Sequence, residues 1–132
     1  MTRPAKTSAL GGLQTVIYSA LTAAGLTVRD EPGENTVFPY ATIGESNAEE
    51  VGSKTDFGDD VYETIHYWSR AKGFKEAKTA VNTIISALSG YTYTVTGFRV
   101  HFADVDAVQT FRDPDGLTRH AVVRVKYKVF QE

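Results

Sequence analysis

Two segments of the chain repeat their apolar residues at the three- and four-residue spacing of an amphipathic helix. The first covers residues 9–24 and is followed by Gly25, a residue that commonly ends helices. The second runs from Phe74 to Gly90 and carries polar residues on its other side. The spacing predicts two helices with these apolar faces: Leu13, Val16, Ile17, Ala20, Leu21 and Ala24 in the first, and Phe74, Ala77, Val81, Ile84, Ile85 and Leu88 in the second.

The other apolar segments of the first hundred residues are predicted to be extended. Residues 38–45 form a strand that opens at a proline, where the missing N–H harms the ladder least. Residues 61–69 are rich in β-branched and aromatic side chains on both faces, which favours a central strand. Shorter extended pieces are expected at residues 26–28 and 91–95.

The last third of the chain predicts a run of antiparallel strands. Residues 98–103 alternate apolar and polar, the alternation breaks near residues 104–107 as at a bulge, and extended structure resumes at residues 108–112. An Asp-Pro-Asp-Gly turn at residues 113–116 then leads into the longest predicted strand, residues 117–130. This strand has an apolar face and a basic face, formed by Ala121, Val123, Val125, Tyr127 and Val129 and by Arg124, Lys126 and Lys128.

Two polar segments fall outside this pattern. Residues 1–8 are polar and basic and are expected to form a flexible N-terminal arm. Residues 46–60 are acidic and poor in apolar side chains, so a long loop that orders against a partner is expected there. The remainder, residues 9–132, is expected to be a single domain of the α+β class, with two helices packed on one face of a mainly antiparallel sheet.

Composition narrows the function classes. The 132 residues carry a formal net charge of −2, which lacks the electrostatic footprint of general phosphate binding. The chain has no cysteine, which removes disulfides and thiolate chemistry and is compatible with a reducing cytoplasm. We see neither a membrane span nor a signal peptide in it, and expect a soluble protein.

Candidate catalytic and metal-binding groups are weak. His66, His101 and His120 all fall on predicted strands, but they lack the short spacing of a metal motif, and we expect surface or sheet-edge positions. Acidic pairs such as Glu49 with Glu50 are typical of a solvated loop and do not follow a calcium-binding pattern. No catalytic residue, cofactor site or metal site is therefore predicted, and the protein is not expected to be an enzyme.

Five blocks spread over nearly the whole chain, taken together and in order, resemble the phage tail completion family of long-tailed phages. They are residues 13–18 (LQTVIY), 38–44 (FPYATIG), 66–70 (HYWSR), 74–77 (FKEA) and 111–120 (FRDPDGLTRH). The resemblance implies a tail-terminator-like fold and a structural protein of the head-to-tail junction. Such a protein caps the finished tail tube as a ring, typically of six copies, and joins the tail to the neck.

The same resemblance implies partners and a location. The partners are further copies of this chain, the tail tube protein and a head-closure or neck protein, with DNA passing through the ring lumen without sequence-specific binding and without any membrane. The location is the virion tail, after assembly in the cytoplasm of the host bacterium. Another neck or tail tube subunit is the first alternative, and a small binding domain of the host is the second.

From charge, we predict that the acidic segment of one subunit meets the basic strand face of the next. The candidate interface residues are Glu49, Glu50, Asp56, Asp59, Asp60, Arg124, Lys126 and Lys128.

Overall fold

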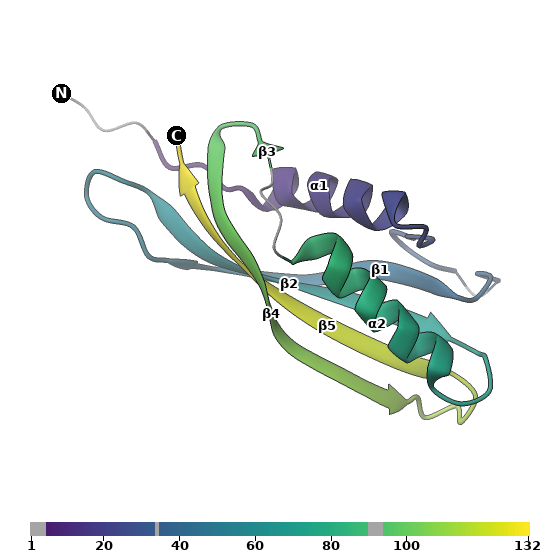
Figure 1. The fold of residues 1–132 in the computed structure, drawn as a ribbon. Coiled ribbons are helices and arrows are strands. Elements are labelled where there is room, and N and C mark those ends of the chain that lie inside the picture. The colour runs from purple at the N-terminus through teal and green to yellow at the C-terminus, as the bar shows by residue number, and fades with distance from the viewer. Residues whose placement is uncertain (1–4, 34, 90–93) are drawn as a thin grey trace.

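A five-stranded antiparallel sheet carries both helices on one of its faces (Figure 1). This computed structural model describes residues 5–33, 35–89 and 94–132. The strand order is β1-β2-β5-β4-β3. Strand β2 therefore pairs with both β1 and β5, although β1 is the first strand in the chain and β5 is the last. The elements are α1 (Leu10–Ala23), β1 (Tyr40–Glu50), β2 (Gly58–Ser69), α2 (Lys75–Leu88), β3 (Thr94–Val95), β4 (Phe98–Arg112) and β5 (Arg119–Gln131).

The core lies between the sheet and the helices. From Asp60 to Ser69 the burial along β2 alternates strictly, and Ile65 is fully buried on the face that α1 and α2 cover. Ile17 of α1 and Ile84 of α2 are also fully buried. Burying each such side chain contributes about 1.5–3 kcal/mol, which explains why the helical stripes decide where the helices dock. The opposite face of the sheet, which we call the open face, carries no helix (Figure 1).

The predicted fold class is confirmed. The helices lie within two residues of their predicted limits, although Gly90 is outside the described residues. The central position of β2 is confirmed by its pairing on both sides. The predicted bulge is confirmed by a register shift between Val105 and Ala107, but it does not divide the strand. Strand β4 therefore continues through the bulge and has 15 residues, whereas β5 has 13. The prediction that the last strand is the longest is wrong.

The segment expected to be a 15-residue loop is mostly a β-hairpin. Strand β1 continues to Glu50 and β2 begins at Gly58, so only residues 51–57 connect them. Both strands stay paired here through backbone hydrogen bonds, from Ser46 opposite Glu63 to Glu50 opposite Asp59. The polarity misled the prediction because the β1 residues from Ser46 to Glu50 are exposed on both faces, although Val61 and Glu63 on the paired strand are buried.

The described part of the N-terminal arm lies against the same end of the sheet. The backbone N–H of Thr7 donates to Gln131 Oε1 at 2.9 Å, and Gln131 Nε2 donates to the carbonyl of Ala5 at 3.0 Å. Lys6 forms ion pairs with Glu50 and Asp59. A flexible arm was expected through residue 8, whereas residues 5–8 are tied to β5 and to the hairpin. Residues 1–4 of that prediction lie outside the described residues.

Candidate functional site

The five predicted acidic residues gather at the projecting end of the β1–β2 hairpin, on both of its faces. Glu49 lies opposite Asp60 on the open face, and Glu50 lies opposite Asp59 on the helix side. On the helix side Lys6 bridges the two carboxylates, and its hydrogen bond to Asp59, then that to Glu50, raises the pKa of Lys6. The hairpin end is therefore a clustered acidic surface with one lysine supplied by the arm.

The predicted basic residues lie on the open face of β5, as expected, and two of them are already paired within the chain. Lys126 Nζ lies 3.7 Å from Asp60 Oδ2, and Arg124 Nε lies 3.4 Å from Asp106 Oδ2. Both cations also approach the ring of Tyr62, at 4.4 Å for Arg124 and 5.8 Å for Lys126. The acid–base match that the sequence suggested between subunits thus occurs in part inside one subunit.

The Arg124–Asp106 pair is exposed and stabilises little, whereas the Asp60 side chain of the other pair is only 15% exposed. The side chain of Arg124 is 44% exposed and that of Asp106 is 37% exposed, a setting in which a pair contributes about 0–1 kcal/mol. Asp56, at the end of the connection, lies 3.4 Å from Arg99 and is similarly open to solvent. Weak pairs of this kind can exchange partners, so they leave the charges available to a neighbouring molecule.

The opposite end of the sheet is held by the Asp-Pro-Asp-Gly turn between β4 and β5. Asp115 accepts backbone N–H groups from Leu117 and Thr118 at 2.8 Å each and the Thr118 hydroxyl at 2.7 Å. The hydrogen bonds from Thr118, foremost its backbone N–H, lower the pKa of Asp115 to about 2. Gly116 has a φ of 72°, which glycine adopts without strain. The turn is thus built by local chemistry that the sequence displays openly.

The histidines are the group that the sequence reasoning missed. His66 Nδ1 and His120 Nε2 lie 2.8 Å apart on the open face, although these residues are 54 positions apart in the chain. His101 lies elsewhere, against Phe130 with ring centroids 4.9 Å apart. The sequence alone could not reveal this contact, because it depends on the β2–β5 register. That register pairs His66 with Val122 and Trp68 with His120, which puts both histidines on the same face. Among the described residues, no group of three or more histidine or acidic side chains is arranged to hold a metal ion.

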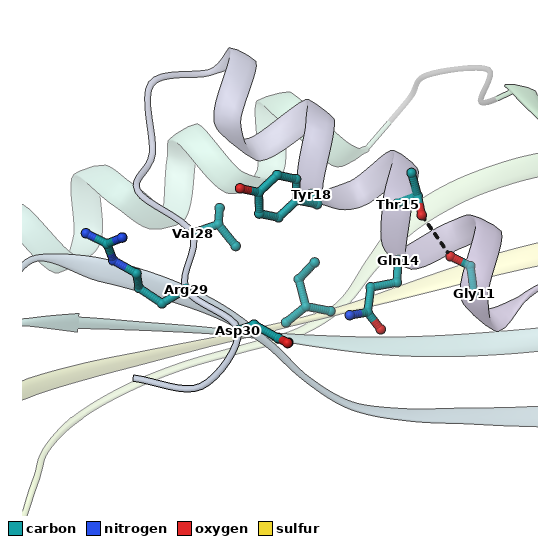
Figure 2. Close-up of a pocket in the computed structure, with 8 residues that line it drawn as sticks. Gly11, Gln14, Thr15, Tyr18, Val28, Arg29 and Asp30 are labelled. Atoms are coloured by element: carbon teal, nitrogen blue, oxygen red, sulfur yellow. Dashed lines mark hydrogen bonds between the residues drawn. The ribbon is translucent and has the colours of Figure 1, made fainter. Parts of the chain in front are cut away.

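A hollow of about 430 Å³ lies between α1 and the segment that leads toward β1 (Figure 2). Tyr18 and Gln14 project from the helix, while Arg29 and Asp30 come from the facing segment. The Thr15 hydroxyl at its rim donates to the Gly11 carbonyl at 3.2 Å and so serves the helix itself. The hollow is a depression lined by both polar and apolar side chains.

Comparison with known proteins decides the family. The family model described as tail completion protein gp17 matches residues 15–129, nearly the whole chain. The chain belongs to the tail completion protein gp17 family. The resemblance seen in the sequence is thereby confirmed, and the chain is a structural protein of the phage tail.

A curated relative and a solved structure extend the comparison. The chain is 24% identical over 102 residues to the tail completion protein gp17 of Bacillus phage SPP1, a match that covers 77% of this chain and 75% of that protein. It also superposes on a chain from the virion of a native gene transfer agent particle with a TM-score of 0.84. That match covers 95% of this chain and 99% of the other at 20% identity, and so establishes a shared fold.

Within the described residues no helix is long and apolar enough to cross a membrane.

Proposed function

We propose that this protein completes the phage tail by capping the finished tube as a ring, and that the ring joins the tail to the head through the neck. The observation that carries the proposal is the family match over residues 15–129. The fold supports it, because a twisted sheet backed by two helices gives a rigid subunit and the projecting β1–β2 hairpin can reach a neighbour. The ring is taken to be a closed homo-oligomer of six subunits.

The ring has two further partners in this proposal, the tail tube protein below it and a head-closure or neck protein above it. Assembly takes place in the cytoplasm of the host bacterium, and DNA passes through the lumen without sequence-specific contacts. The chemistry supports a protein-facing role because the charges of the open face alternate in sign, with Arg124 beside Asp106 and Lys126 beside Asp60. A surface that binds phosphate would carry a surplus of cations.

For the subunit interface, we propose that the hairpin carboxylates of one copy approach the basic face of β5 on the next. The pairs within one chain modify the original idea, because Asp60 must share Lys126 with the neighbour's acids. Lys128 lies in register with Asp60 and adds a second cation to the same place. Such rim charges steer the encounter between subunits more than they hold the finished ring together.

Phage particles that lack this protein test the role. Failure to cap the tube should give tails of abnormal length that do not join heads, and the gene supplied in trans should restore infectious particles. Electron microscopy of the lysate distinguishes the outcomes. Tails of normal length joined to heads would contradict the proposal, and the absence of any tube would indicate a tube subunit instead.

The interface proposal has its own test on the purified protein. The double variant K126E/K128E reverses two of the cations and should slow ring assembly at low salt, with the difference fading as salt screens the charges. Lys72 and Lys75, two solvent-exposed cations at the start of α2 and on the other side of the sheet, provide a matched control as K72E/K75E. Unchanged assembly of K126E/K128E at low salt would contradict this interface but not the proposal that the protein forms a ring.

A further inference from the structure

Four titratable side chains form a continuous chain across the open face of the sheet. His66 Nε2 lies 3.1 Å from Glu45 Oε2, His66 Nδ1 lies 2.8 Å from His120 Nε2, and His120 Nδ1 lies 3.3 Å from Asp113 Oδ1. The chain starts on β1 at its bulge, crosses β2 and β5, and ends on the turn after β4. It therefore connects three strands and a turn through side chains alone.

The imidazole rings are held in place by their surroundings. The side chains of His66 and His120 are 17% and 13% exposed. Trp68 stacks on both rings, with centroid distances of 5.4 Å to His66 and 4.6 Å to His120. On the β1 side, a Cβ atom placed on Gly44 would lie 2.6 Å from His66 Cδ2, so only glycine leaves room for the ring there. The contacts thus fix both nitrogen atoms of each ring relative to their partners.

Counting protons gives the charge of this chain. The carboxylates of Glu45 and Asp113 only accept hydrogen bonds, so each needs a ring N–H facing it. The contact between the two rings needs one further N–H and one lone pair. Three protons on four ring nitrogens satisfy every contact, whereas two neutral histidines carry only two. The geometry therefore matches one imidazolium and one neutral imidazole between two carboxylates.

We propose that His66 and His120 share one extra proton between Glu45 and Asp113, and that this charge state is a pH-sensitive latch joining β1 to the β4–β5 turn. With two ring protons, either a lone pair faces a carboxylate oxygen at one end of the chain or two lone pairs face each other between the rings. With four, two cations meet N–H to N–H. Either change weakens the latch, so it is closed only in the range where a single extra proton is bound.

The surroundings assign the charge to one ring. Burial lowers the pKa of His120, opposed by the Asp113 carboxylate and reinforced by His66. His120 is therefore the neutral member, with its proton on Nδ1 toward Asp113, and its Nε2 accepts from His66. His66 then donates from both nitrogens, and its hydrogen bond lowers the pKa of Glu45. The described groups acting on the pair are thus Glu45 from β1 and Asp113 from the turn.

Nitrogen NMR of the histidine rings of the full-length protein tests the latch. In a titration from pH 8 to pH 5, the spectra should pass through a stage at which three of the four ring nitrogens of His66 and His120 are protonated, while the exposed His101 serves as an internal reference. In Glu45→Gln the pH at which the pair loses its extra proton should fall by about one unit, because a neighbouring opposite charge is removed. Glu45 is 79% exposed, so this change leaves the fold intact.

The matched variants make the test decisive. Asp113→Asn should lower the same transition, and Glu49→Gln, an exposed acid on the same strand, should leave it unchanged. The absence of any three-proton stage between pH 8 and pH 5, or a transition that ignores both Glu45→Gln and Asp113→Asn, would overturn the latch. The experiment reads the protonation of His66 and His120 within one subunit, so its result does not depend on whether the protein assembles into a ring.

Discussion

Glu63 provides the sharpest test of how this fold treats a buried charge. Its side chain is fully buried on the helix side of β2. It lies opposite Ser46, next to the β-bulge of β1. Oε2 accepts a hydrogen bond from the Ser46 hydroxyl at 2.6 Å, and among the described residues Oε1 has no hydrogen-bond partner. Burial therefore raises the pKa of Glu63, against the smaller opposing effect of Ser46.

The sign of the pH effect follows from that direction. Below the ordinary pKa of 4.5 the carboxyl is protonated in both the folded and the unfolded chain, and its burial carries no charge penalty. As pH rises past that value the unfolded chain releases the proton while the folded chain retains it, so stability is lost up to the raised folded pKa. The loss is about 1.4 kcal/mol for each unit by which the folded pKa exceeds the unfolded one.

The assay compares Glu63→Gln with the wild type by urea unfolding at several pH values between 4 and 8. Glutamine keeps the shape of the side chain but cannot ionise, so the wild type should lose stability relative to the variant as pH rises across that range, by about 1.4 kcal/mol per unit of pKa shift. Taking the difference between the two proteins cancels the histidines and the other shared groups. Glu49→Gln, on the exposed hairpin, should run parallel to the wild type. Parallel curves for Glu63→Gln would refute the reasoning.

Three further changes test the core, the turn and the hairpin. Ile17→Ala should lower the free energy of unfolding by about 2–5 kcal/mol, because it leaves a cavity under α1, whereas Tyr18→Ala on the exposed side should cost much less in the same urea titration. Asp115→Asn should remove the stability that the wild-type turn has above pH 3.8 and loses as pH falls toward 2. In urea unfolding the variant should therefore be less stable than the wild type at neutral pH, and the difference should disappear near pH 2. Gly52→Ala places a Cβ 2.2 Å from the carbonyl oxygen of Asp56 and should distort the hairpin connection, detected as faster amide exchange there with the core unaffected.

The local sequence was sufficient to predict the elements whose structure depends on nearby residues. The helical stripes around Ile17 and Ile84 marked the buried faces, because a helix in a small domain must hide one side. The turn at Asp115 was readable for the same reason, since its hydrogen bonds join residues no more than three positions apart. The family resemblance rested on these same local blocks and was confirmed by the match over residues 15–129.

The hairpin and the charge pairs required long-range information. Residues 46–50 are strand because β2 pairs with them, although their side chains have no core to face. Arg124 and Lys126 appeared free for a neighbouring subunit in the sequence, but the sheet register brings Asp106 and Asp60 beside them. Polarity predicts exposure to solvent, and it does not distinguish a loop from a strand that is exposed on both faces.

By itself, the sequence determined that the chain forms two amphipathic helices on an antiparallel sheet and that it belongs among phage tail completion proteins. Only the tertiary structure decided that His66 meets His120 and that Glu63 is buried with one oxygen unpaired. The physical reason is that periodicity records which face of an element avoids water. Which distant side chains share that face depends on strand order and register, and these are set by the packing of the whole domain.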